Sequence, residues 1–289
     1  MAFSFDRQDA NLQATLRRIA SEELGLALAR LGQIKQPEAV HAVRKNLKKT
    51  RAMLRLVRTG IDVQPAENAA LRQVAMALAS RRDAAARLIT FDSLFPEPPD
   101  ALRPLRDHLA VGSQAPGIGL PADLPHTLKE IRKRAEKWSL CGKDANIVGL
   151  GLTDTRRKAI RAAKAARAEP MSELLIHNWR KRVKDHWYQA RLFAPCWPEL
   201  FKPIVESADR LGEDLGRHHD LSLFADFIDT LPAKIVPAPA QRLLAAAIDD
   251  VRRRITETAF PASARLFAGD PEGVADLWVD LWRVWQGRA

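Results

Sequence analysis

The sequence predicts an all-α protein, and three observations support this fold class. The 289-residue chain lacks any sustained alternation of β-branched residues, the pattern that half-buried strands leave in a sequence. Ala, Leu, Arg, Lys and Glu dominate the composition and favour helices. Hydrophobic residues make up 46% of the chain and recur at helical spacing, which suits a soluble globular protein with a sizeable core.

In the first half of the chain, Pro37 stands at the start of a periodic segment, where a first-turn proline is favourable. The Pro- and Gly-bearing stretch 111–125 is expected to be a loop. The apolar periodicity predicts helices over 9–31, 38–59, 66–94 and 122–139.

In the second half, residues 141–153 carry glycines and are expected to form another loop. Ser172 is placed to cap the helix that follows it. Trp278, Trp282 and Trp285 recur at helical spacing and are expected to fill the core of this half. The periodicity predicts helices over 153–168, 171–193, 198–217, 219–231, 239–267 and 271–286.

The charge balance is the first indication of function. Lys and Arg number 46 against 35 Asp and Glu, a formal charge of +11, which favours nucleic acid, acidic lipid or another polyanion as a partner. Cys141 and Cys196 form no CxxC pair, so neither a zinc site nor a disulfide is expected. The N-terminus lacks an export signature, and no apolar run approaches the ~18 residues that cross a bilayer. We therefore expect a cytoplasmic protein that does not enter a membrane.

An internal repeat indicates two similar halves. The segment "HAVRKNLKKTRAMLRLV" (41–57) aligns without a gap with "HNWRKRVKDHWYQARLF" (177–193). About forty residues further on, "ALASRRD" (77–83) corresponds to "DLGRHHD" (214–220). We predict two halves, residues 1–145 and 146–289, each with about four to five helices.

Both copies of the repeat predict an amphipathic helix with one cationic side. At about 100° per residue, the basic residues of each copy fall on one stripe, and apolar residues lie opposite. By this interpretation neither stripe contains an acid, although helix surfaces usually mix charges at i and i+4. A solvated helix face explains a single stripe of this kind. The same acid-free stripe in both copies of the repeat favours a binding surface for an external anion.

At these residues the sequence resembles the CHAD family, the conserved histidine α-helical domain. The first shared element is a helix that begins with His, has Arg three positions on and continues with basic residues, as in "HAVRKNLKKTR" and "HNWRKRVKDHWY". The second is a leucine helix that runs into a charged residue and Asp, as in "LASRRD" and "LGRHHD". The resemblance covers nearly the whole chain. It departs from the family at Trp187, which corresponds to Arg51, and at His219, where an Arg is usual.

This resemblance implies two helical bundles, related by an approximate two-fold axis, around a basic groove or pore. It also implies binding of inorganic polyphosphate without hydrolysis and recruitment to polyphosphate granules and their proteins. No cofactor or metal is expected. Asp83 and Asp220 are expected to cap a following helix or to orient a neighbouring Arg or His. The residues assigned to polyphosphate are His41, Arg44, Lys45, Lys48, Arg51, Arg55, Arg81, Arg82, His177, Arg180, Lys181, Lys184, Tyr188, Arg191, His218 and His219.

Some of these assignments have a plain alternative. His41 and His177 gain charge below neutral pH if a phosphate lies nearby, or else are neutral histidines bonded to a backbone carbonyl. The basic run 156–167 either extends the binding surface or is a solvated outer face.

Three other functions are alternatives to polyphosphate binding. Charge alone permits a nucleic-acid binder, but no reader motif or set of base-stacking aromatic residues on loops is evident. The "HHD" at 218–220, with His177, resembles part of a metal-dependent phosphohydrolase site, but the surrounding cations oppose metal binding. A scaffold that docks on granules and recruits another protein is compatible with polymer binding.

Overall fold

The structure is a computed structural model that describes residues 3–32, 37–78, 83–114, 121 and 123–287. These residues form eleven α-helices and two short 3-10 helices and contain no strand, so the all-α prediction is confirmed. None of the helices described is both long and apolar enough to cross a bilayer. The elements are α1 (Leu12–Leu31), α2 (Pro37–Leu56), η1 (Arg58–Gly60), α3 (Gln64–Ala77), α4 (Asp83–Leu94), η2 (Asp100–Leu102), α5 (Arg103–Gln114), α6 (Leu124–Ala135), α7 (Asp144–Ala168), α8 (Glu173–Phe193), α9 (Pro198–Asp229), α10 (Ala238–Leu266) and α11 (Pro271–Trp285).

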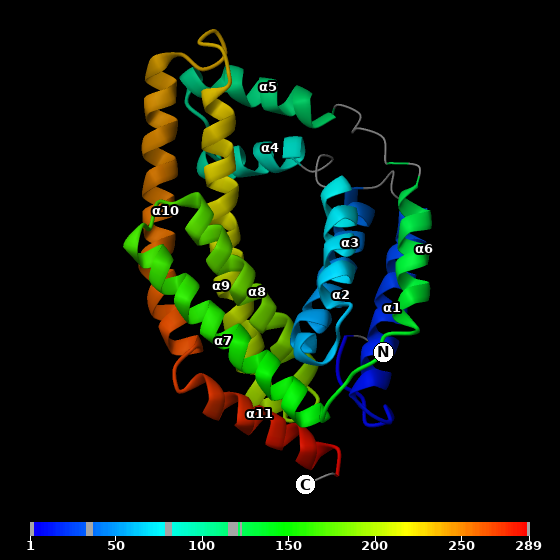
Figure 1. Cartoon of the computed structure of the whole chain (residues 1–289). Helices are drawn as coiled ribbons and strands as arrows, with labels where there is room; N and C mark the ends of the chain where they lie inside the picture. Colours follow the sequence, from blue (N-terminus) through cyan, green and yellow to red (C-terminus); the bar gives the residue numbers. More distant parts are fainter. Residues whose placement is uncertain (1–2, 33–36, 79–82, 115–120, 122, 288–289) are drawn as a thin grey trace.

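The helices form two groups that meet where α2 contacts α7 and α8 (Figure 1). In one group, α1 and α3 each pack against both α2 and α6. In the other, α7, α8, α9 and α10 pack in succession, and α11 lies against α7. The pair α4 and α5 lies at one end of the molecule, where α4 contacts α9. The elements that carry the two basic repeats, α2 and α8, are thus direct neighbours.

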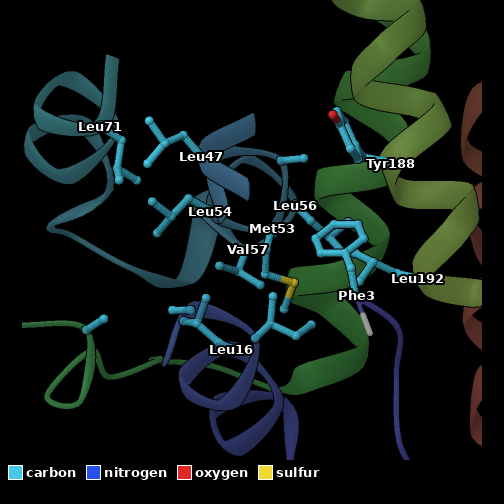
Figure 2. Close-up of a cluster of buried hydrophobic side chains, with 14 of the residues drawn as sticks. Phe3, Leu16, Leu47, Met53, Leu54, Leu56, Val57, Leu71, Tyr188 and Leu192 are labelled. Carbon is cyan, nitrogen blue, oxygen red and sulfur yellow. The ribbon is translucent and has the colours of Figure 1, made fainter. Parts of the chain in front are cut away.

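One hydrophobic core spans both groups. Its buried residues come from α1, α2, α3 and α6, and also from the start of α7, the end of α8 and α11. Figure 2 shows Tyr188 and Leu192 of α8 close to Phe3 and to apolar side chains of α2 such as Leu56. The tryptophans of α11, expected in the core of the second half alone, contribute Trp278 and Trp282 to this shared core, with Trp285 packed at its edge.

A second core cluster joins α4 and α5 to α9 and α10. Phe91 of α4 and Leu105 of α5 pack in it with Phe224 of α9 and Leu244 of α10. The predicted division after residue 145 falls within the first turn of α7, and both clusters extend across it. The organisation into two domains stays a prediction.

Several predicted boundaries are wrong. The single helix expected over 66–94 is two helices, α3 and α4, and α5 was not expected at all. The apolar stripe of α5 is short, since Leu105 and Leu109 lie only one turn apart, and packing against the second cluster stabilises it. The two helices expected over 198–217 and 219–231 are one, α9, because buried residues continue at helical spacing through Leu215, His218 and Leu221. Pro37 begins α2 as predicted, whereas Ser172 holds the N-cap position of α8 without a side-chain capping bond.

The loop expected over 141–153 is largely the first part of α7, and its glycines mark close helix packing. Gly151 is buried, and a Cβ at this position would overlap the backbone carbonyl oxygen of Leu56 at the end of α2. Only glycine allows the backbones of α7 and α2 to approach this closely. Gly149 faces more open space, since the nearest atom to a Cβ there is Val279 Cγ2 at 3.8 Å.

These two glycines provide a matched test of the packing between α7 and α2. Gly151→Ala should lower the free energy of unfolding by about 1–3 kcal/mol, because the helices must move apart. Gly149→Ala should raise it by up to about 1 kcal/mol, because alanine favours the helix and meets no clash. Urea unfolding of both variants measures the two changes. Equal effects of the two substitutions would contradict the close approach at Gly151.

Candidate anion-binding site

The two basic repeats lie on α2 and α8, and their apolar sides are buried as the sequence predicts. Val43, Leu47 and Leu54 of α2 are fully buried, as are Trp179 and Val183 of α8. A helix that buries one side in a core fixes the direction of the other side. The basic side chains of α2 and α8 are therefore held in position by the packing beneath them.

Seven basic side chains from α2, η1, α3, α7 and α8 lie close enough to influence one another, and we call them the cationic cluster. Burial, followed by the charge of Arg55, lowers the pKa of Arg51 to about 10. Burial and then neighbouring cations also lower the pKa values of Arg58, Lys158 and Lys181. An anion placed among such groups would relieve their repulsion. The cluster consists of Arg51, Arg55, Arg58, Arg72, Lys158, Lys181 and Arg182.

Asp185 is the carboxylate inside the cationic cluster. It is 5% exposed, and its Oδ1 lies 2.5 Å from Arg55 Nη2. Its Oδ2 lies 3.0 Å from Nη1 of Arg182, one turn away on the same helix. A buried carboxylate requires such partners, because removing it from water costs several kcal/mol. Since Arg55 belongs to α2 and Asp185 to α8, this ion pair also joins the two repeats.

Asp154 of α7 is the second acid of the cluster. It pairs with Arg58, and its Oδ2 lies 2.9 Å from Lys158 Nζ. Asp154 and Asp185 together pair with four of the seven basic residues. The cluster therefore retains an excess of positive charge.

The three remaining cations are Arg51, Arg72 and Lys181. Arg51 Nε donates to the amide oxygen of Asn68 at 3.0 Å, and Lys181 Nζ donates to that of Asn178 at 3.2 Å. Both acceptors are neutral, so these bonds orient the side chains without cancelling their charge. Arg72 is exposed on α3. These three are the members of the cluster best able to hold an external anion.

The sequence predicts no acid within either stripe, but the folded chain places acids beside the α8 stripe. Asp185 lies at the edge of the α8 stripe. Two more acids, Asp209 and Glu213 of α9, lie beside Lys184 of this stripe. Lys184 Nζ lies 2.7 Å from Glu213 Oε1 and 3.1 Å from Asp209 Oδ1. The spacing within one helix does not show charges that a neighbouring helix contributes, so the positive excess is smaller than the sequence indicates.

Two glycines of α9 make room for basic side chains of α8. A Cβ on Gly212 would lie 2.6 Å from Lys184 Cε, and one on Gly216 would lie 3.0 Å from Arg180 Nη2. Arg180 Nε also donates to the carbonyl oxygen of Gly212 at 3.4 Å. Gly212 and Gly216 are one turn apart, so they form a smooth face on which Arg180 and Lys184 lie.

The predicted residues at the start of α2 are mostly exposed. His41, Lys45 and Lys48 lie on the surface. Arg44 is half-buried, and its Nη1 donates to the carbonyl oxygen of Ala75 at 2.6 Å, which ties α2 to the end of α3. His41, Lys45 and Lys48 are accessible to a ligand, whereas Arg44 also has a structural role.

The aromatic residues of the α8 stripe are engaged in packing. Tyr188 is 4% exposed, and its ring meets that of Phe3 edge to face, so it belongs to the core beneath the stripe. Trp187 is partly buried, and its ring centroid lies 4.5 Å from Lys184 Nζ and 4.9 Å from Arg191 Cζ. Trp187 thus holds two of the predicted basic residues by cation–π contacts.

The histidines of the second half are neutral at pH 7 in the free chain. His177 stacks on His219 with ring centroids 4.3 Å apart, and burial, followed by this neighbour, lowers the pKa of His177 to about 4. His219 Nδ1 lies 3.1 Å from Glu173 Oε1, and burial lowers its pKa as well. His218 is fully buried beneath the surface, with a pKa lowered to about 4 by burial. Asp220 is exposed.

The structure adds little about the other residues that the sequence predicted for the site. Arg81 and Arg82 lie outside the described residues, and of Asp83, the first residue of α4, only the backbone is described. In the basic run 156–167, Arg157 pairs with Glu272 of α11, so this residue points away from the cluster.

Sequence reasoning missed five residues of this site. Arg58 directly follows the first repeat, and Arg182 and Asp185 lie within the second, so these three stand in or next to the repeats. Arg72 and Lys158 belong to α3 and α7. Lys158 lies in the basic run 156–167, whereas no local pattern singles out Arg72, which only the fold brings to α2 and α8.

The fold has known counterparts. Residues 10–229 match the CHAD domain family. The CHAD domain from the plant Ricinus communis has a similar structure, with 18% identity, a TM-score of 0.62 and coverage of 92% of this chain and 94% of that chain. PptA from Streptomyces chartreusis has 17% identity and a TM-score of 0.62 over 88% of this chain and 99% of that chain. No curated protein sequence matches the chain. The family match spans more than half of the sequence, and the chain therefore belongs to the CHAD family.

Proposed function

We propose that this protein binds inorganic polyphosphate without hydrolysing it, and that binding targets it to polyphosphate granules. The binding surface is the cationic cluster, extended along α2 by Lys45 and Lys48 and along α8 by Arg180. Membership of the CHAD family supports this substrate class. The observation that supports the proposal is the convergence of seven basic residues from five elements, of which Asp154 and Asp185 pair with only four.

The chemistry of the cluster suits a flexible polyanion. Arginine binds phosphate oxygens through paired N–H groups, and lysine acts as a mobile point charge. The cluster contains both: four of its arginines are half-buried, and Arg72 and Lys181 are exposed. A chain with about one charge per phosphate contacts several such groups at once and releases counterions. Binding of this kind requires no attacking group.

The aromatic residues favour polyphosphate over single-stranded nucleic acid. Proteins that hold single strands stack bases on exposed aromatic rings. Tyr188 is buried against Phe3, and Trp187 carries Lys184 and Arg191 over its ring. These rings are therefore engaged by the protein itself. The cationic cluster offers positive charge and hydrogen-bond donors, and phosphate oxygens bind to both without aromatic stacking.

The proposal that the protein is not an enzyme rests on the character of the site. Among the residues described, no three His, Cys, Asp or Glu side chains converge in an arrangement that could hold a metal ion. His218 is buried and His219 lies beside Glu173, so the "HHD" segment does not present its side chains together. Phosphate release from polyphosphate with added Mg²⁺ or Mn²⁺ would contradict a binding-only role.

Removing the three cations that Asp154 and Asp185 leave unpaired tests the site. The variant Arg51→Gln, Arg72→Gln, Lys181→Gln should bind polyphosphate at least about tenfold more weakly at moderate salt. The slope of log affinity against log salt should become shallower by about 2, because each contact on a flexible chain releases about 0.7 counterion. Titration of labelled polyphosphate at several salt concentrations measures both quantities.

A matched control loses the same charge elsewhere. The variant Lys133→Gln, Lys137→Gln, Lys202→Gln changes three exposed lysines outside the cluster and should keep the affinity and salt slope of the wild type. Equal weakening in both variants would show that net charge alone drives binding, and the proposed site would be wrong. Displacement by DNA or RNA at equal phosphate concentration would contradict selectivity for polyphosphate.

Protonation of His177 should report a phosphate beside α8. The pKa of His177 is about 4 in the free chain, and a nearby anion favours the charged imidazole, so polyphosphate should raise this pKa by about one unit or more. The complex then takes up a proton, and affinity rises as the pH falls towards 4. NMR titration of the His177 imidazole with and without polyphosphate measures the shift, and His177→Gln identifies the signal. An unchanged pKa would place the ligand away from His177.

A further inference from the structure

A pocket of about 640 Å³ lies among α7, α8, α9, α10 and α11. It opens away from the cationic cluster, because Arg156, which lines it, and Lys158, a cluster residue, lie about 200° apart around α7. Its volume is typical of sites for small organic molecules. The pocket has a polar inner part, a charged rim and an apolar wall, which together indicate the kind of molecule that fits.

The inner part carries two buried polar side chains whose hydrogen-bonding capacity is only partly used or unused. Arg156 is 4% exposed; its Nη2 donates to the carbonyl oxygen of Ala268 at 2.8 Å, whereas its Nε is buried without a partner. His186 is 1% exposed, and neither ring nitrogen has a partner. Buried polar groups are usually satisfied by protein or water, so these unpartnered nitrogens leave hydrogen-bonding capacity among the residues that line the pocket.

The electrostatics of the inner part favour an anion. Burial, followed by the charge of Arg156, lowers the pKa of His186 to about 3, so the imidazole is neutral and the guanidinium is the inner charge. Arg210 and Arg265 add two exposed cations that line the pocket, against one acid, Asp214. The residues that line the pocket therefore carry an excess of positive charge.

The wall of the pocket is apolar and partly aromatic. Trp278 lines it, and its ring centroid lies 5.4 Å from that of His186. Ile204, Leu266 and Val274 complete this wall. Inorganic phosphate alone would leave these surfaces exposed to water, whereas an aromatic or aliphatic group would bury them.

We propose that this pocket binds a small organic anion, with a carboxylate or phosphate group on Arg156 and His186 and an apolar body against Trp278. The site is separate from the proposed polyphosphate surface and does not depend on it. Arg156 also supports the turn between α10 and α11 through Ala268. That structural role accounts for Nη2 and leaves Nε, His186 and the cationic rim unexplained.

Calorimetric titration of the whole chain with four probes tests the proposal. Phenyl phosphate or benzoate should bind saturably with one site per chain, and the tighter of the two identifies the anionic group. Inorganic phosphate lacks the apolar ring, and benzyl alcohol lacks the anionic group. Each should bind at least about tenfold more weakly, since a charge-assisted hydrogen bond or a buried ring contributes at least that factor to affinity. Polyphosphate should not displace the bound probe.

Variants locate the binding. Arg156→Gln should weaken the better probe by at least about tenfold, the effect of one lost charge-assisted bond. The rim variant Arg210→Gln, Arg265→Gln should weaken binding of the better probe several-fold. If Arg156→Gln does not fold, the rim variant tests the proposed site instead. The control Lys234→Gln, Arg242→Gln removes the same charge outside the pocket and should change nothing. Absence of saturable binding, equal binding of inorganic phosphate, displacement by polyphosphate, or unchanged affinity in the rim variant would overturn the proposal.

Discussion

The buried carboxylate of Asp185 is the interaction on which the rest of the site depends. It joins α8 to α2 through Arg55 and balances Arg182 within its own helix. Such a group is costly to bury, and removing one partner of a buried ion pair leaves an uncompensated charge. By pairing with Arg55 and Arg182, Asp185 lets basic residues of both repeats gather where two helix groups meet. It does so without neutralising the cluster as a whole.

Glycine sets the distances between the helices that carry this charge. Gly151 lets α7 approach the end of α2, which brings Asp154 and Lys158 beside Arg58. On α9, a pair of glycines one turn apart receives the long side chains of α8. In both places the absence of a Cβ determines where cations lie. Helix packing and electrostatics are therefore parts of one arrangement, in which small residues define the geometry of the charged ones.

The sequence predicted correctly which side of a single helix is buried, but it did not predict the charges that neighbouring helices bring to that helix. The periodicity of 41–57 and 177–193 correctly placed Val43 and Trp179 in the core and the basic residues opposite. It could not show that α9 would bring Glu213 to Lys184, because that acid is distant in sequence. Glycines at the start of α7 predicted a loop, yet their physical role is close packing, and local composition does not distinguish the two.

The cationic cluster is, on this account, an anion site that Asp185 occupies in part when no ligand is bound. The most direct measurement is thermal unfolding of Asp185→Asn with and without polyphosphate. Without ligand, the variant should lose about 3 kcal/mol of stability, because Arg55 and Arg182 stay half-buried without their partner. Polyphosphate should then raise the melting temperature of the variant more than that of the wild type, since its phosphates replace the lost carboxylate. An equal or smaller rise in the variant would contradict the account.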